Sequence, residues 1–178
     1  MMDACIEVSS ELGKGSTFTV TITVDTAQPD IHEMQNAPSV VMPMGPLKDI
    51  FNGKRVLLAE DIEINREIIH SLLEDTGLEI VYAQDGAEAL DLFCAAPQSY
   101  DLILMDVQMP NMDGDEATKK IRSSGHPGAE SIPVIALTAN VFREDIERYL
   151  SAGMNGHLGK PIDPRQLTEM LAQYLIGK

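Results

Sequence analysis

Short aliphatic segments that alternate with helix-type patterns constrain the fold of residues 53–178 more than any other feature. Several of these segments are apolar throughout, as expected of parallel strands that are buried on both faces. Apolar residues at helical spacing follow the segments along the chain. The predicted strands are 55–59, 79–83, 101–106, 132–138 and 157–160. This alternation predicts a (βα)5 chain that folds as a doubly wound α/β domain with a five-stranded parallel sheet.

Two helix boundaries in this region carry their own signals. Gly77 is expected to end the first helix, because glycine adopts the left-handed backbone conformation that terminates helices. Asp163 and Pro164 are expected to begin the last helix, as its N-cap and its first residue. Four apolar residues of that helix are predicted to face the sheet: Leu167, Met170, Leu171 and Leu175.

Residues 1–24 follow a different period. Apolar and polar residues alternate along Ile6–Ser9 and along Thr17–Val24, and Gly13-Lys14-Gly15 lies between these two segments. This pattern predicts an antiparallel β-hairpin. A two-stranded hairpin is only marginally stable alone, so we expect it to belong to a larger unit or to pack on a neighbour.

Residues 25–52 keep no hydrophobic period and contain four prolines, at positions 29, 38, 43 and 46. Such a segment is typical of a flexible linker. The predicted organisation is therefore a hairpin at 1–24, a linker at 25–52 and an α/β domain at 53–178.

Charge and cysteine content exclude several classes of protein. The formal net charge is −15, with an acidic excess before and after residue 53, which argues against nucleic acid as a partner. No apolar stretch approaches the roughly 18–20 residues of a membrane span, and the acidic Asp3 without a basic segment argues against a signal peptide. Cys5 and Cys94 match no disulfide or metal pattern. We therefore expect a cytoplasmic chain without membrane contact.

Residues suited to phosphoryl transfer stand at the ends of the predicted strands. They are Glu60 and Asp61 after the first strand, Asp106 on the third, Thr138 on the fourth and Lys160 on the fifth. Because ligands bind at the carboxyl ends of the strands in such sheets, we expect these side chains to meet on one rim. Three carboxylates in one place would repel each other unless a hard divalent cation such as Mg²⁺ held them.

The residues of this rim have distinct chemical roles in the predicted site. Asp106 is the candidate nucleophile, which would form an acyl phosphate. Lys160 can neutralise the oxygens of a phosphoryl group, and Thr138 can donate a hydrogen bond to one of them. Gln108, in the loop after Asp106, is predicted to offer its backbone carbonyl oxygen to the metal ion.

Residues 53–178 resemble a two-component receiver domain over their entire length. The most specific match is the run Met105-Asp106-Val107-Gln108-Met109-Pro110-Asn111-Met112-Asp113-Gly114, with shorter matches at Leu57–Asp61, Asp85-Gly86, Leu137-Thr138-Ala139 and Lys160-Pro161. The resemblance implies a flavodoxin-like fold in which Asp106 accepts a phosphoryl group from a phosphohistidine. It also implies that Mg²⁺ is held by Asp61 directly and by Glu60 through water, and that Thr138 and Lys160 contact the phosphoryl group. The Lys160–Pro161 peptide bond is expected to be cis.

The predicted switch position departs from the common receiver pattern. Receivers often carry Tyr or Phe three residues before the lysine, where this chain has His157. By resemblance, inward movement of Thr138 is coupled to inward rotation of that side chain. His157 either takes this role or is an exposed edge-strand histidine without one. Asp115 also stands where receivers often carry an apolar residue.

The hairpin resembles the last two strands of a histidine-kinase ATP-binding domain, whose final glycine motif is matched by residues 13–18. The glycine spacing is not that of a Walker P-loop. The order of kinase end, linker and receiver implies the C-terminal piece of a hybrid sensor histidine kinase, whose membrane anchor would lie elsewhere. Since the upstream nucleotide-binding motifs are missing, we expect this chain to catalyse only its own aspartyl phosphorylation and dephosphorylation.

The resemblance also implies the partners, and the residues leave two other functions open. The expected donor is a phosphohistidine of a kinase dimerisation domain or of a histidine phosphotransfer protein, docked on the first helix and nearby loops. A haloacid dehalogenase-type hydrolase would want a second aspartate two residues after the nucleophile, where this chain has Gln108. A degenerate receiver would bind partners without phosphorylation, although the complete set of rim residues argues against it.

Overall fold

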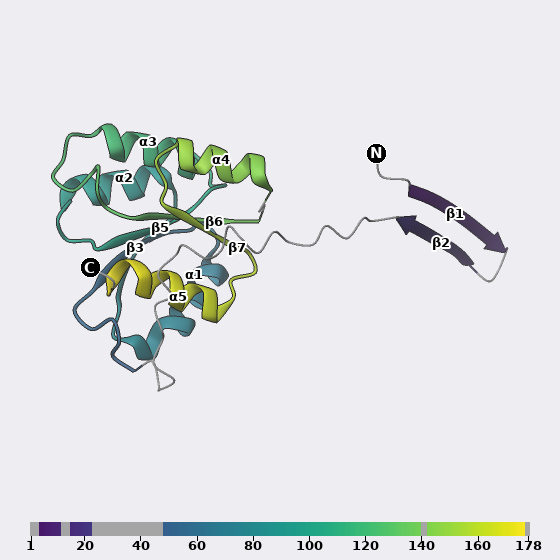
Figure 1. Ribbon diagram of the computed structural model, residues 1–178, viewed down its shortest axis with the longest axis horizontal. Coiled ribbons are helices and arrows are strands. Elements are labelled where there is room, and N and C mark those ends of the chain that lie inside the picture. Colours follow the sequence, from purple (N-terminus) through teal and green to yellow (C-terminus); the bar gives the residue numbers. More distant parts are fainter. Residues whose placement is uncertain (1–3, 12–14, 23–47, 140–141, 177–178) are drawn as a thin grey trace, which may run out of the picture. The chain divides into compact units, whose positions relative to one another are not determined.

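The computed structural model describes residues 4–11, 15–22, 48–139 and 142–176. The hairpin and the α/β domain are separate compact units, so each is described by itself (Figure 1). Among the helices of the described ranges, none combines the length and the apolar composition that crossing a bilayer requires.

The N-terminal unit is the predicted hairpin. Strands β1 (Ala4–Glu11) and β2 (Gly15–Ile22) pair antiparallel, with Ala4 opposite Ile22 and Glu11 opposite Gly15. The predicted turn residues Gly13 and Lys14, and the predicted strand end at 23–24, lie outside the described residues.

The α/β domain has a single sheet of five parallel strands in the order β4-β3-β5-β6-β7. Its strands are β3 (Arg55–Ala59), β4 (Glu79–Ala83), β5 (Leu102–Asp106), β6 (Val134–Thr138) and β7 (Gly156–Gly159). Its helices are α1 (Glu63–Leu73), the 3-10 turn η1 (Glu74–Thr76), α2 (Gly86–Ala95), α3 (Gly114–Ser123), α4 (Arg143–Ser151) and α5 (Pro164–Leu175). The predicted doubly wound fold is therefore confirmed.

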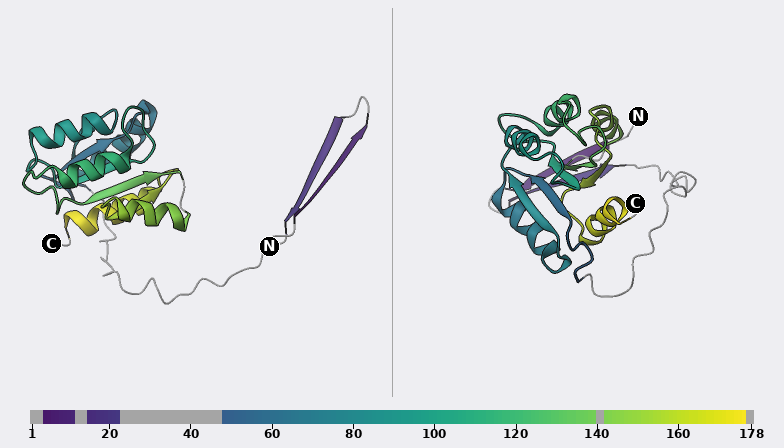
Figure 2. Two further views of the ribbon diagram at one scale, coloured as in Figure 1. Left: turned by 90° about the horizontal axis from the view of Figure 1, so that it is seen from above. Right: turned by 90° about the vertical axis from the view of Figure 1, so that its left-hand side faces the viewer.

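Helices cover both faces of the sheet, α1 and α5 on one side and α2, α3 and α4 on the other (Figures 1 and 2). Each face of the sheet has its own hydrophobic core, and alternate residues of a strand pack into one core or the other. On β5, for example, Ile103 and Met105 pack beneath α2, α3 and α4, whereas Leu102 and Leu104 pack beneath α1 and α5. This alternation follows from the two-residue period of a strand, and it decides which side chains can meet at the strand ends.

The helix boundaries agree with the predicted signals. Gly77 follows η1 in the left-handed conformation at a φ of 73°. Asp163 caps α5 by accepting hydrogen bonds from the backbone N–H groups of Arg165 and Gln166, and Pro164 is the first helical residue. Both boundaries are thus fixed by local chemistry.

The end of the predicted linker belongs structurally to the α/β domain. Phe51 is fully buried in the core beneath α1 and α5. The backbone N–H groups of Asp49 and Phe51 donate to the carbonyl oxygens of Asp75 and Thr76, at 2.9 and 2.8 Å. The buried Phe51 ring and two backbone hydrogen bonds therefore attach this segment to the domain, although the sequence around Phe51 has no hydrophobic period.

Candidate functional site

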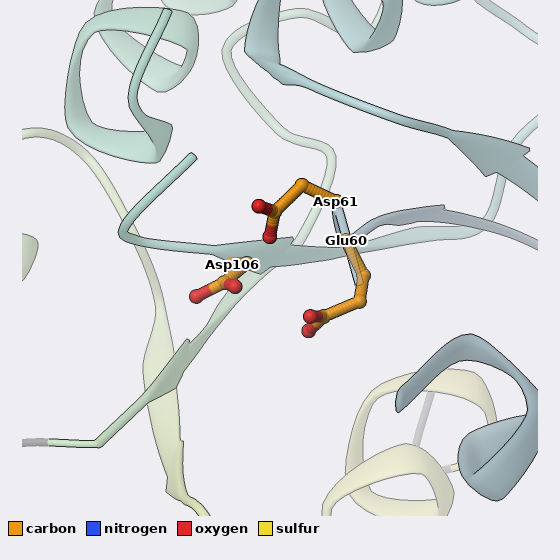
Figure 3. Close-up of side chains that lie close together, drawn as sticks. All are labelled: Glu60, Asp61 and Asp106. Carbon is orange, nitrogen blue, oxygen red and sulfur yellow. The ribbon is translucent and has the colours of Figure 1, made fainter. Parts of the chain in front are cut away.

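The predicted acidic residues meet where β3 and β5 end (Figure 3). The chain runs from β3 to the neighbouring strand β4 on one side and then to β5 on the other, so this is the point where the strand order reverses. One carboxylate oxygen from each of Glu60, Asp61 and Asp106 lies within 4.8 Å of the others. Carboxylate oxygens are ligands that Mg²⁺ prefers, so this donor set fits the predicted magnesium ion.

Lys160 joins two of the three carboxylates. Its Nζ atom donates to Glu60 Oε2 at 2.6 Å and to Asp106 Oδ2 at 2.7 Å. The side chain of Glu60 has no exposed surface and that of Asp106 is 7% exposed. The Lys160–Pro161 peptide bond is cis, as predicted. Because both carboxylates are buried, the Lys160 ammonium neutralises their charge where electrostatic interactions are stronger than in water.

Helix α1 holds Glu60 from the other side. Asn65 Nδ2 donates to Glu60 Oε1 at 2.7 Å, so both carboxylate oxygens of Glu60 have protein partners. Arg66 Nη1 donates to the backbone carbonyl oxygens of Glu60 and Asp61, at 2.6 and 3.0 Å. The role of Asn65 and Arg66 in fixing the acidic pair was not predicted from the sequence.

Burial and the hydrogen bond between Asp106 and Lys160 shift the pKa of each residue in opposite directions. Burial raises the pKa of Asp106, and the hydrogen bond from Lys160 offsets only part of that rise. Burial by itself would lower the pKa of Lys160, but its bonds to Asp106 and Glu60 outweigh burial and raise that pKa. Lys160 is therefore firmly cationic. Additional positive charge in the site would stabilise the ionised form of Asp106.

The motif after Asp106 shapes the loop beside the site. A side chain at Gly114 would collide with the backbone carbonyl oxygen of Asp106, so only glycine lets α3 begin this close to β5. Asp113 caps α3 by accepting a hydrogen bond from Glu116 N at 2.8 Å. Gln108 N donates to Asp106 Oδ1 at 3.3 Å, which places Gln108 next to the acceptor. The metal-binding role of the Gln108 carbonyl stays a prediction.

The predicted Thr138 is buried at the end of β6, and its hydroxyl has an unpredicted partner. Thr138 Oγ1 lies 2.9 Å from the phenolic oxygen of Tyr149 on α4. His157 is partly buried in the neighbouring strand β7, in register with Ala136. Its switch role stays a prediction. Tyr149 could not be found from the sequence, because a tyrosine on a helix face signals only packing.

Asp115 is accounted for by an ion pair between two helices. Its Oδ2 atom accepts from Arg148 Nε of α4 at 2.8 Å. Both residues line an open cleft of about 520 Å³ beside Asp61 and Gln108. The unusual acidic residue at the start of α3 therefore connects α3 to α4 next to the acidic site.

Comparison with known proteins agrees with this geometry. The model of the response regulator receiver domain matches residues 56–172. The aerobic respiration control sensor protein ArcB of Escherichia coli (strain K12) is 36% identical over 173 residues, covering 97% of this chain and 21% of that protein. Hybrid signal transduction histidine kinase I of Dictyostelium discoideum is 40% identical over 121 residues, covering 66% of this chain and 7% of that protein. The chain thus spans about a fifth or less of these two relatives.

Two solved structures show the same fold. The receiver domain of sensor histidine kinase PA1611 from Pseudomonas aeruginosa PAO1, with a magnesium ion coordinated in its active-site cleft, is 38% identical with a TM-score of 0.62. It matches 71% of this chain and 99% of that one. The receiver domain of Saccharomyces cerevisiae Ssk1, crystallised with the histidine phosphotransfer protein Ypd1, is 29% identical with a TM-score of 0.64, covering 71% of this chain and 92% of that one. This chain belongs to the response regulator receiver domain family.

Proposed function

We propose that Asp106 accepts a phosphoryl group from a phosphohistidine, in the Mg²⁺-dependent phosphorelay of a hybrid histidine kinase. The observation that carries this proposal is the nearly buried Asp106 carboxylate, held by Lys160 beside two further carboxylates at the strand-order reversal. Such a carboxylate is oriented for attack and lies where transition-state charge can be neutralised.

The transfer forms one covalent bond, between a carboxylate oxygen of Asp106 and the phosphorus atom. A carboxylate oxygen of Asp106 attacks the phosphorus atom, the phosphorus–nitrogen bond breaks, and its electron pair returns to the imidazole of the donor. The Lys160 ammonium neutralises charge on the phosphoryl oxygens. When bound, Mg²⁺ supplies further neutralisation of the phosphoryl oxygens and of the clustered carboxylates.

Glu60 and Asp61, the two acidic residues after β3, differ in burial and in hydrogen bonding, which supports different roles for them. Glu60 is fully buried, and its two carboxylate oxygens already accept from Asn65 and Lys160. Asp61 is partly exposed and lines the cleft that contains Gln108. We therefore assign direct metal contact to Asp61 and Asp106, and assign Glu60 to hold Lys160 and to act on the metal through water.

The face beside the site has exposed apolar side chains that suit a partner protein. Three isoleucines have large exposed fractions, which is unusual for this residue: 49% for Ile62 just before α1, and 58% and 48% for Ile64 and Ile68 on α1. Ile68 also lines a small cavity of about 140 Å³ together with Lys160 and Ile162. Docking here of a kinase dimerisation domain or a histidine phosphotransfer protein would bring its phosphohistidine to Asp106.

The hybrid-kinase context rests on the hairpin and on the relatives. The paired strands β1 and β2 precede the receiver in this chain, and the ArcB match extends over 97% of it. The proposal places this receiver after the end of a kinase ATP-binding domain. It implies a cytoplasmic location, where ATP supplies the phosphoryl group.

Replacing Asp106 by asparagine is expected to abolish phosphorylation. The wild-type chain, incubated with Mg²⁺ and acetyl phosphate, should gain the mass of one phosphoryl group, because the Asp106 carboxylate is the nucleophile. Intact mass spectrometry measures the adduct. Asp91→Asn on the exposed surface of α2 is the matched control and should be phosphorylated normally. An adduct that persists in Asp106→Asn would contradict the assignment, and rapid turnover of phosphate esters would instead identify a hydrolase.

Replacing Ile64, which is exposed on α1 and does not line the cavity that contains Lys160, by lysine is expected to separate docking from chemistry. Phosphotransfer from a cognate phosphohistidine protein should slow at least about tenfold, since a buried interface side chain is worth roughly 1.5–3 kcal/mol. Phosphorylation by acetyl phosphate should stay unchanged, because that donor needs no protein contact. Stopped transfer reactions separated by gel electrophoresis measure the first rate. Equal slowing with both donors would place the effect in the site rather than on the docking face.

A further inference from the structure

Thr138, a predicted contact of the phosphoryl group, has a buried partner, Tyr149, that the proposed chemistry does not use. Their oxygens are 2.9 Å apart, and either hydroxyl can be the donor. Thr138 is 3% exposed and Tyr149 is 2% exposed. At this burial, a hydroxyl that loses its partner has little water to replace it, so breaking the contact has a cost.

Strand alternation places this contact on one face of the sheet. Val134 and Ala136 belong to the core beneath α2, α3 and α4, so Thr138, two residues further along β6, lies on the same face. Ile135 and Leu137 belong to the core beneath α1 and α5. The Thr138 side chain therefore faces α4, which carries Tyr149.

The acceptor aspartate lies on the other face. Asp106 is in register with Leu137, and Leu102 and Leu104 of the same strand pack beneath α1 and α5. Lys160 reaches Asp106 from that side, where it also binds the fully buried Glu60. A phosphoryl group on Asp106 would be attached on this face. Thr138 then has to turn away from Tyr149 to donate a hydrogen bond to it.

Tyr149 is itself held in place, so it is a fixed partner. The guanidinium of Arg148 lies 5.1 Å from the centre of the Tyr149 ring. The same guanidinium forms the ion pair with Asp115 of α3. The Tyr149 ring is thus packed against the arginine whose ion pair connects α3 and α4.

We propose that the Tyr149 hydroxyl is a resting partner of Thr138 and competes with the phosphoryl group on Asp106 for the Thr138 hydroxyl. Tyr149 is a positioning residue, which acts on the phosphoryl group only through Thr138. Phosphorylation exchanges one hydrogen bond for another and releases α4 from the end of β6. This inference rests on the proposed phosphoacceptor function. It moves the coupling to Thr138 from β7, where His157 was predicted to act, to helix α4.

The experiment is a titration of the full chain with beryllofluoride, a phosphoryl analogue, in the presence of Mg²⁺. Wild-type binding has to break the Tyr149–Thr138 bond, whereas Tyr149→Phe keeps the ring and removes the competing hydroxyl. The variant should bind about fivefold more tightly, the size set by one net hydrogen bond. Tyr174→Phe is the matched control, because its hydroxyl donates to Asn155 O instead, and its affinity should equal that of the wild type.

Each other outcome overturns the inference. Unchanged affinity in Tyr149→Phe would make Tyr149 a packing residue only, and weaker binding would show that its hydroxyl supports the phosphoryl contact. A wild-type chain that binds no beryllofluoride would contradict the phosphoacceptor function itself. A second measurement needs no variant. The ring signals of Tyr149 in ¹³C-tyrosine-labelled wild type should shift on beryllofluoride binding while those of Tyr174 stay in place, and a still Tyr149 would contradict the exchange.

Discussion

Replacing Lys160 by methionine is expected to lower the free energy of unfolding by about 3–5 kcal/mol in metal-free buffer. The Lys160 Nζ atom forms ion pairs with Glu60 Oε2 at 2.6 Å and with Asp106 Oδ2 at 2.7 Å. Methionine preserves the length of the side chain but removes the charge. Glu60 would keep its hydrogen bond from Asn65, which cannot neutralise a fully buried carboxylate.

Magnesium should restore most of the stability lost in Lys160→Met. A cation that binds only the folded state stabilises it by mass action, and the variant site is more negative than the wild-type site. Urea denaturation followed by circular dichroism, with EDTA and then with millimolar Mg²⁺, measures both values. The difference between the two conditions should be larger in Lys160→Met than in the wild type.

Lys54→Met is the matched control for Lys160→Met. Lys54 Nζ pairs with Asp101 Oδ1 at 3.0 Å, but these side chains are 38% and 35% exposed. Because water screens such a pair, its loss should cost no more than about 1 kcal/mol. Similar losses in the two variants, or a Lys160→Met loss that Mg²⁺ leaves unchanged, would contradict a buried charge cluster at the strand ends.

The rim of the site was predictable because strand ends obey a strong topological rule. In a doubly wound sheet the carboxyl ends of the parallel strands share one edge, so residues far apart in sequence must meet there. Asp106 and Lys160 are 54 positions apart, yet their side chains are 2.7 Å apart. The fold was predictable for a related reason, since each buried strand needs apolar residues on both faces.

Side chains that act between helices were not predictable in the same way. Tyr149 and Arg148 occupy ordinary helix positions, and their partners depend on how α4 is rotated against α3 and β6. That rotation is decided by packing of the whole core, and no local sequence pattern reports it. Phe51 was missed because the residues around it look like linker, while its burial depends on a groove made by distant helices.

Replacing Arg122 by methionine is expected to lower the free energy of unfolding by about 3 kcal/mol without changing the phosphoryl site. Arg122 extends from α3 and donates to Ala129 O at 2.6 Å and to Gly153 O at 2.8 and 3.0 Å. A fourth bond joins it to Asn155 Oδ1 at 2.9 Å, and that oxygen also accepts from Val134 N. One guanidinium therefore ties α3 to the segments that precede β6 and β7.

The backbone around Arg122 leaves room for its side chain and offers carbonyl oxygens to its planar guanidinium group. Gly153 has a φ of +96°, and a Cβ there would lie 3.1 Å from Arg122 Cγ. Burial lowers the pKa of Arg122, yet a guanidinium remains charged at any ordinary pH, so its bonds to neutral carbonyls stay charge-assisted. Lysine supplies a single ammonium and cannot reach all three acceptors, so Arg122→Lys should recover less than half of the loss.

Arg122 and Lys160 differ in what else their replacement should change. Arg122 acts at the edge where β6 and β7 begin, whereas the acidic site lies where strands end, so folded Arg122→Met should bind Mg²⁺ and beryllofluoride with wild-type affinity. Arg143→Met is the matched control for stability, because that arginine is 93% exposed and pairs with Glu147 on its own helix. Its unfolding curve should overlay that of the wild type. Weakened beryllofluoride binding in Arg122→Met would show that the two ends of the sheet are coupled, and equal stability of the two arginine variants would refute the anchoring role of Arg122.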